Sequence, residues 1–241
     1  MRTLTAILKR ELLTYFHSPI GYVFAAVSVL TSGFFFLMFC LGYGSADISS
    51  VFAMMFFVLM VFVPLLTMRL FSEEQKLGTD RLLLTSPVNL GGLVLGKFFA
   101  ALIVFALSTL VLPFYGVMLS IFTEVNWASV WGNYVGLLLL GAVYIAIGML
   151  VSSLTENQMI AAVGGFFLNL VTFILTPLSD AVSDSSLPLG FLANALKYLS
   201  VYDRFTEFTL GIFDFANILF FISFAAVFLF LTVRSVDGRR W

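Results

Sequence analysis

The chain has 241 residues, of which 61% are hydrophobic and 10% are charged, and its formal net charge is −1. A soluble domain of this length carries about a quarter charged residues, so the apolar excess predicts a protein surrounded by lipid. No basic run is present to bind nucleic acid. With one Cys and one His, the sequence excludes an intrachain disulfide, most metal centres and Ser-His or Cys-His catalysis, so we expect no catalytic or metal-binding residues.

Residues 3–17 precede the first long apolar stretch and show helical periodicity, with an apolar and a polar face. This pattern predicts a helix lying in the membrane interface. The alternative is a cytosolic segment that only anchors the topology. We assign Leu8, Leu12 and Tyr15 to the apolar face of this interfacial helix. Lys9 and Arg10 are its basic residues. Ser18 and Pro19 end it and suit the start of the next helix.

Six apolar stretches are long enough to cross a hydrocarbon core of about 30 Å as helices, which takes about 20 residues each. Because lipid cannot satisfy free backbone groups, we predict an all-α polytopic membrane protein that forms one domain over residues 1–241. The predicted spans are 21–42, 51–71, 94–122, 130–153, 159–178 and 213–233. Pro64 and Pro113 lie inside the second and third spans and are expected to kink them.

The Lys and Arg residues predict the orientation of the chain. Ten lie in the segments that six spans would place on one side, and only Lys197 and Arg204 lie on the other. Basic residues concentrate in cytoplasmic segments, so the side with ten is expected to be cytoplasmic, together with both termini.

Segment 69–87, between the second and third spans, concentrates charge in a chain that otherwise avoids it. Gly78 suits a helix end. Thr79 suits the N-cap of a second short helix, which would carry several leucines on an apolar patch and end at Pro87. This pattern predicts a cytoplasmic docking element, and the alternative is a solvated loop that only fixes topology. The predicted docking residues are Arg69, Glu73, Glu74, Lys76, Gly78, Thr79, Asp80, Leu82, Leu84 and Pro87.

Residues 91–97 match the GxxxxGK start of a nucleotide-binding loop, but Phe98 stands where Mg²⁺ coordination needs Ser or Thr. No strand precedes this stretch and an apolar span follows it. We therefore expect no nucleotide or other cofactor in this chain, and we expect Lys97 to extend to the membrane interface.

No Asp, Glu, Lys or Arg lies near the centre of a span, which disfavours a proton- or ion-coupled carrier and indicates an energy source outside the chain. The mild polar residues inside the spans either line a pathway or pack helices together, and packing is favoured. They are Thr67, Asn169, Thr172 and Thr176.

The predicted external segment 179–212 contains an apolar run at 189–199 that is too short to span and suits a re-entrant or interfacial helix. Asp203, Arg204 and Glu207 are expected to pair with one another at the surface.

Several motifs together resemble a known family. They are Lys9-Arg10-Glu11 with Ser18-Pro19 before the first span, the stretch from Phe71 through Glu73-Glu74 and Gly78-Thr79 to Pro87, Gly96-Lys97 opening the third span, and the ending Arg239-Arg240-Trp241. Over its whole length the chain resembles the ABC-2 family of ABC transporter permeases. Within that family it is most similar to the GldF group, which is associated with gliding motility.

The resemblance implies a fold like that of type V exporters and pairing with a second permease copy, identical or related. It also implies a coupling helix between the second and third spans that seats on a separate ATP-binding subunit, which holds ATP and Mg²⁺. Short external helices between the fifth and sixth spans are a further implied feature. In the GldF group, a partner with a large extracytoplasmic domain is also implied.

We therefore expect a multi-pass protein of the bacterial cytoplasmic membrane. It would couple ATP hydrolysis by a separate subunit to substrate export or to movement of an extracytoplasmic partner. The alternative is a non-transporting scaffold or a mechanotransmission subunit of a membrane complex. An intramembrane enzyme is disfavoured, because His17 lies outside the spans and Cys40 has no histidine partner.

Overall fold

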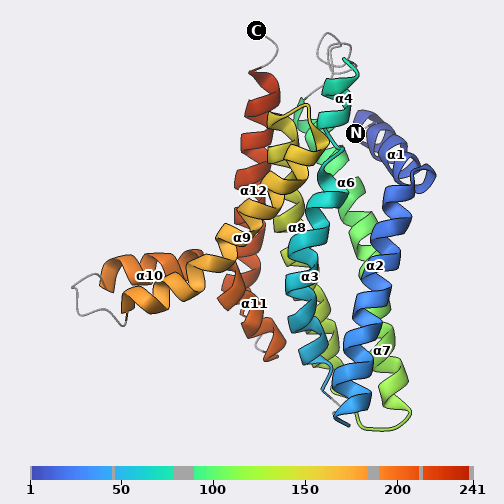
Figure 1. Ribbon diagram of the computed structural model, residues 1–241, viewed down its shortest axis with the longest axis vertical. Helices are drawn as coiled ribbons and strands as arrows, with labels where there is room; N and C mark the ends of the chain where they lie inside the picture. Colours follow the sequence, from blue (N-terminus) through green and yellow to red (C-terminus); the bar gives the residue numbers. More distant parts are fainter. Residues whose placement is uncertain (1, 45–46, 79–89, 184–189, 212–213, 239–241) are drawn as a thin grey trace.

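The computed structural model describes residues 2–44, 47–78, 90–183, 190–211 and 214–238, and every regular element in them is a helix (Figure 1). In chain order these are α1 (Arg2–His17), α2 (Pro19–Phe36), the π-helical η1 (Leu37–Gly42), α3 (Ser49–Thr67), α4 (Ser72–Lys76), α6 (Leu90–Thr109), α7 (Val111–Ser120), α8 (Trp127–Leu154), α9 (Gln158–Ser183), α10 (Gly190–Leu199), α11 (Val201–Thr209) and α12 (Phe215–Asp237).

Six helical stretches of the described chain are long and apolar enough to cross a membrane, which confirms the predicted all-α fold with six spanning helices. They are Pro19–Gly42, Ser49–Lys76, Leu90–Ser120, Trp127–Leu154, Gln158–Ser183 and Phe215–Asp237. Each predicted span falls on one of them.

Local sequence explains several of the helix ends. Pro19 occupies the first turn of α2, where its missing N–H costs no helical hydrogen bond. The side chain of Asn126 caps α8 by accepting from the backbone N–H of Ala128 at 3.1 Å. The third span breaks at Leu110, between α6 and α7, because Pro113 cannot donate to the carbonyl one turn earlier. The kink predicted at Pro113 is confirmed.

The long α8 forms the centre of the bundle and packs against α3, α6, α9, α11 and α12. Most of the buried side chains of α8 are apolar, with Asn133, Ser152 and Ser153 as buried polar residues. The start of α1, all of α4 and the last turns of α12 lie at the same end of the bundle (Figure 1). We call this the charged end, because the buried ion pairs described below lie there. Its assignment to the cytoplasm stays a prediction.

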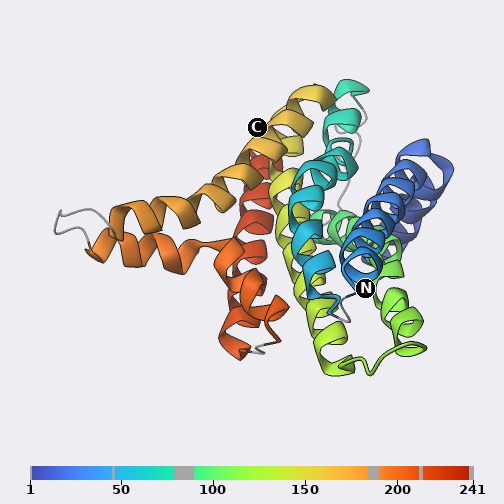
Figure 2. The ribbon, with the colours of Figure 1, turned by 60° about the horizontal axis from the view of Figure 1, so that its bottom comes forward.

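The second half of α9 leaves the bundle and α10 runs back beside it, so the two form a projecting arm (Figures 1 and 2). The short helix predicted at 189–199 is therefore confirmed as α10.

The predicted mutual pairing of Asp203, Arg204 and Glu207 is wrong, since no ion pair joins them in the described chain. Instead Arg204 donates to Oδ1 of Asn217 at 2.8 Å, and Nδ2 of Asn217 donates to Glu207. Asn217 is buried at the start of α12 and offers both a donor and an acceptor, so it ties α11 to α12.

Candidate functional site

The turn between α3 and α4 interrupts the helical hydrogen bonds and leaves backbone groups to be satisfied by other parts of the chain. Ser152, which is fully buried on α8, fills this break. Its hydroxyl accepts from the N–H groups of Phe71 and Ser72 at 3.1 and 3.2 Å and donates to the carbonyl of Met68 at 3.0 Å. One α8 side chain thus fixes the direction in which α4 leaves α3.

Lys97 lies inside the protein, so the prediction that it extends to the membrane interface is wrong. The residue is 1% exposed. Its ammonium donates to the carbonyl of Leu70 at 2.7 Å and forms ion pairs with Glu74 at 2.9 Å and Glu11 at 3.3 Å. The physical reason is that a buried charge must be paired and hydrogen-bonded, and the break after α3 supplies a free carbonyl beside two carboxylates.

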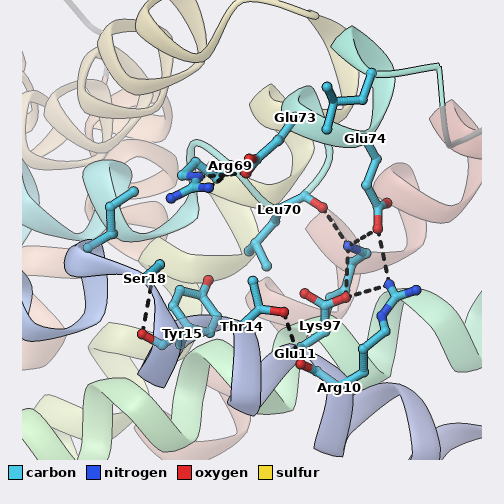
Figure 3. A pocket seen from close by; sticks show the side chains of 12 residues that line it. Arg10, Glu11, Thr14, Tyr15, Ser18, Arg69, Leu70, Glu73, Glu74 and Lys97 are labelled. Carbon is cyan, nitrogen blue, oxygen red and sulfur yellow. Dashed lines mark hydrogen bonds and ion pairs between the residues drawn. The ribbon is translucent and has the colours of Figure 1, made fainter.

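Arg10 completes a closed arrangement of alternating charges. Its guanidinium lies 2.6 Å from Glu11 and 3.1 Å from Glu74, and Lys97 contacts the same two carboxylates from the other side (Figure 3). The hydrogen bond to Glu11 raises the pKa of Arg10 above its usual value. We call these four residues the charge ring. It joins α1, α4 and α6, which are far apart in the sequence.

A second ion pair lies beside the ring and is more exposed than Lys97 and its two carboxylates. Arg69 donates to both carboxylate oxygens of Glu73 at 2.6 Å, one helical turn further along the chain. Exposed pairs of this kind contribute about 0.2–1 kcal/mol, whereas removing one partner of a buried pair costs about 3–5 kcal/mol. Both sets of charges border a cavity of about 200 Å³ (Figure 3). The ion pairs of the buried Lys97 are therefore the stronger connection.

The predicted docking residues divide into three groups. Arg69, Glu73 and Glu74 are engaged with other residues of this chain. Lys76 is exposed at the end of α4, and the helix end predicted at Gly78 is confirmed, since this glycine has a φ of +69° just beyond α4. The remaining predicted residues lie outside the described part of the chain. They are Thr79, Asp80, Leu82, Leu84 and Pro87.

The predicted N-terminal helix is present as α1, and Leu12 and Tyr15 of its predicted apolar face pack against protein. Tyr15 is buried and donates to the carbonyl of Leu66 at 3.1 Å, and this burial raises the pKa of its phenol. Leu12 packs against the core, whereas Leu13 and Phe16 are exposed. The reason is that α6 and the free carbonyls at the end of α3 offer partners on this side. Of the other predicted residues, Leu8 is partly buried and Lys9 and Arg10 are exposed.

Asn169 has a structural partner inside the bundle. Pro64 cannot donate to the carbonyl of Met60, one turn earlier in α3. Nδ2 of Asn169 on α9 donates to that carbonyl at 3.3 Å, and α3 continues through Pro64. Gly165, one turn before Asn169, lets α9 approach closely, because a Cβ there would lie 3.2 Å from the Pro64 ring.

The threonines predicted alongside Asn169 also make helix contacts. Thr67 donates to the carbonyl of Val63 at 3.2 Å, and Thr172 donates to that of Asn169 at 2.7 Å. The hydroxyl of Thr176 lies 2.5 Å from that of Ser200 at the start of α11. Of these three hydrogen bonds, only that of Thr176 joins two helices, since Thr67 and Thr172 donate within their own helices, and packing stays the favoured prediction for this set.

Sequence reasoning missed Glu11 and Ser152 as members of the site. One signal for Glu11 was available, since Lys97 is a lone cation at the start of an apolar run and a buried cation requires a carboxylate. Glu11 and Glu74 were among the carboxylates at the same side of the predicted membrane. No sequence signal marks Ser152, because its role depends on the position of α8 beside the α3–α4 break.

A search among curated protein sequences finds no match. A family model described as ABC-2 family transporter protein matches residues 10–236. The match begins at Arg10 in the charge ring and extends to Val236 near the end of α12, so it includes all six spanning stretches. The chain therefore belongs to the ABC-2 family of transporter proteins.

Proposed function

We propose that this chain couples ATP hydrolysis by a separate subunit to substrate export or to the movement of an extracytoplasmic partner. As an ABC-2 family member with six spanning helices, it is a multi-pass permease component of an ABC transporter. Such a permease works with an ABC ATP-binding subunit, which would carry the ATP and Mg²⁺.

The observation that carries the proposal is the fixation of α4 on several sides. The charge ring joins α4 to α1 and α6, and Ser152 joins its first residue to α8. Gln75 adds a hydrogen bond from its Nε2 to the carbonyl of Ser153 at 3.1 Å. A force applied to α4 by a bound protein would therefore reach three other helices without an intervening flexible joint.

The partner would contact residues that this chain does not use itself. Lys76 and Leu77 are exposed at the end of α4 and lead into the predicted coupling helix with Thr79, Asp80, Leu82, Leu84 and Pro87. Reversing Glu73 and Glu74 is a poor test of docking, because both carboxylates hold basic residues of this chain. A docking test has to change the exposed residues.

Other parts of the proposal follow from the resemblance to the family. The charged end would face the bacterial cytoplasm, and a second permease copy, identical or related, would complete the transporter. Membership of the GldF group would add a subunit with a large extracytoplasmic domain.

The test is recovery of the ATP-binding subunit with the tagged chain from native membranes in mild detergent. The variant Lys76→Glu/Leu77→Asp changes the exposed end of α4. The matched control, Glu124→Lys/Phe122→Asp, makes similar changes in exposed residues between α7 and α8, at the opposite end of the bundle. We expect near-equal recovery with the wild type and the control, and a several-fold loss with the α4 variant.

Full recovery with the α4 variant would reject this docking site. If the folded wild-type chain brings no ATP-binding subunit under several detergents, the non-transporting scaffold becomes the better account.

A further inference from the structure

A polar cavity and an apolar groove meet where α2 begins. The cavity beside the charge ring is bordered by Ser18 and Ile20, at the start of α2. A second hollow of about 210 Å³ lies between α2 and α3, and the residues that line it are all apolar. We call it the α2–α3 groove. Ile20 borders both hollows, so the groove continues the polar cavity away from the charged end.

The α2–α3 groove lies between two spanning stretches, Pro19–Gly42 and Ser49–Lys76. Its walls include Val23, which is 59% exposed, and Leu65, which is 40% exposed. Apolar surface left open in this way marks a contact with lipid or with another protein. The polar cavity at the end of the groove favours lipid, because a phospholipid carries its charged headgroup directly above its apolar chains.

The polar cavity presents an ion pair to such a headgroup. Arg69 donates to Glu73 through Nε and Nη2, and within the described residues Nη1 of Arg69 donates to no other group. The end of Arg69 points toward Tyr15 and Ser18, on the side of the cavity where α2 begins (Figure 3). Guanidinium groups bind phosphate oxygens through their N–H groups. The side chain of Arg69 is 28% exposed, so a phosphate in the cavity can reach it.

The balance of charge around the cavity favours a zwitterion over an anion. A headgroup with both a phosphate and an ammonium can place one beside Arg69 and the other beside Glu73, whereas an anion is attracted and repelled about equally. A carboxylate has about four lone-pair sites, so Glu73 can accept from an ammonium while it holds Arg69. The bordering charges are three basic and three acidic residues, namely Arg10, Arg69, Lys97, Glu11, Glu73 and Glu74.

We infer that the polar cavity and the α2–α3 groove hold one zwitterionic phospholipid with a primary ammonium, of the phosphatidylethanolamine type. Its phosphate accepts from Arg69, its ammonium donates to Glu73, and one acyl chain lies in the groove. The lipid is a resident part of the folded permease and not its cargo. The inference requires a membrane but no ATP-binding subunit, so it stands apart from the docking proposal.

A resident lipid at this place adds α2 to the connected end of the bundle. The charge ring joins α1, α4 and α6, and none of its four members belongs to α2. The acyl chain would pack against α2 and α3, while the headgroup would hold Arg69 and Glu73 at the junction of α3 and α4. The lipid composition of the membrane would therefore determine how firmly α2 follows the movements of α4.

The experiment is native mass spectrometry of the purified full-length chain, stripped of lipid in detergent and then titrated with one lipid at a time. We expect one phosphatidylethanolamine to bind the wild type more tightly than phosphatidylglycerol, and inorganic phosphate not to displace it. Arg69→Gln should weaken binding about tenfold, as expected for the loss of one charge-assisted hydrogen bond. Leu65→Trp, which fills the groove, should weaken binding several-fold.

The matched controls change exposed residues of α12. Arg234→Gln alters a basic residue and Leu231→Trp alters an apolar one, and neither should change lipid binding. SDS titration shows whether each variant is folded before its lipid binding is compared with that of the wild type.

Three results would overturn the inference. Equal binding of phosphatidylglycerol and phosphatidylethanolamine rejects the zwitterion. Unchanged phosphatidylethanolamine binding in folded Arg69→Gln or folded Leu65→Trp rejects the site. A complex with inorganic phosphate that Arg69→Gln abolishes and Leu65→Trp leaves intact assigns the cavity to free phosphate in place of a lipid.

Discussion

Two carbonyls of the second spanning stretch lack a donor from their own helix, and side chains of different chemistry supply one. At Pro64, the free carbonyl of Met60 accepts from the neutral amide of Asn169. After α3, the free carbonyl of Leu70 accepts from the ammonium of Lys97. We call the hydrogen bond to Met60 the neutral joint and the bond to Leu70 the ionic joint. The neutral joint lies within the apolar stretch, and the ionic joint lies at the charged end. A neutral amide costs much less to bury than an ion, so the ionic repair is confined to the place where carboxylates gather.

The difference also determines what each joint connects. The neutral joint connects two helices, α3 and α9, through one hydrogen bond. The ionic joint needs two carboxylates to balance Lys97, and these come from α1 and α4, with Arg10 closing the ring. Burying a cation thus links three elements at the end of the bundle where a partner would bind. This linkage is the physical basis of the proposed coupling.

Replacing Lys97 should break the ionic joint and have the largest effect. Lys97→Met removes the cation between Glu11 and Glu74 and leaves the carbonyl of Leu70 without its donor. We expect a loss of about 3–5 kcal/mol in the free energy of unfolding, measured by SDS titration of the purified chain in mixed micelles.

The exposed Lys197→Met serves as the control and should change stability by less than about 0.5 kcal/mol. After Lys97→Met, Arg10 alone balances two carboxylates, and adding Glu11→Gln removes one of them, so the double variant should lose less than the sum of the two single losses. Equal effects of Lys97→Met and Lys197→Met would contradict the burial of the ring.

Replacing Asn169 should break the neutral joint with an intermediate effect. Asn169→Leu leaves the carbonyl of Met60 unsatisfied in the bundle interior, and we expect a loss of about 1–3 kcal/mol. In a Pro64→Ala background, the new N–H of residue 64 can donate to that carbonyl. The same Asn169→Leu change should then cost roughly 1 kcal/mol or less. A double-mutant cycle by SDS titration measures the difference, and strict additivity would refute the proposed repair.

Replacing Tyr15 should loosen the contact between α1 and α3 slightly. Tyr15→Phe removes only the hydroxyl that donates to the carbonyl of Leu66, so we expect a loss of about 0.5–1.5 kcal/mol. The exposed Tyr22→Phe is the matched control and should have no measurable effect. The same titration measures both variants. A loss in Tyr22→Phe as large as in Tyr15→Phe would argue against the α1–α3 contact.

Local signals were sufficient to predict the helices. Long apolar runs predicted the six spans, Pro113 predicted the break between α6 and α7, and Gly78 predicted the end of α4. Each of these depends on a residue and its near neighbours. The docking residues beyond Gly78 and the assignment of the charged end to the cytoplasm stay predictions.

The charge ring could not be predicted in the same way, because it depends on which helices meet. Arg10 and Glu74 are 64 residues apart in the chain, and Lys97 and Glu11 are 86 apart. Lys97 near the start of a span has the pattern of a residue that extends to the membrane surface, and only the packing of α1 on α6 shows that protein covers it.

The most direct test of the central claim is whether the ring makes α1 and α4 move as one unit. Spin labels at Lys9→Cys and Lys76→Cys, in a Cys40→Ala background and diluted with unlabelled chains, report the distance between these helices by pulsed electron paramagnetic resonance. In the complex with the ATP-binding subunit, we predict the same distance with and without trapped ATP, and an ATP-dependent change once Glu74→Gln cuts the ring by removing the carboxylate that Arg10 and Lys97 share. An ATP-dependent change with the ring intact, or an unchanged distance after it is cut, would contradict the account.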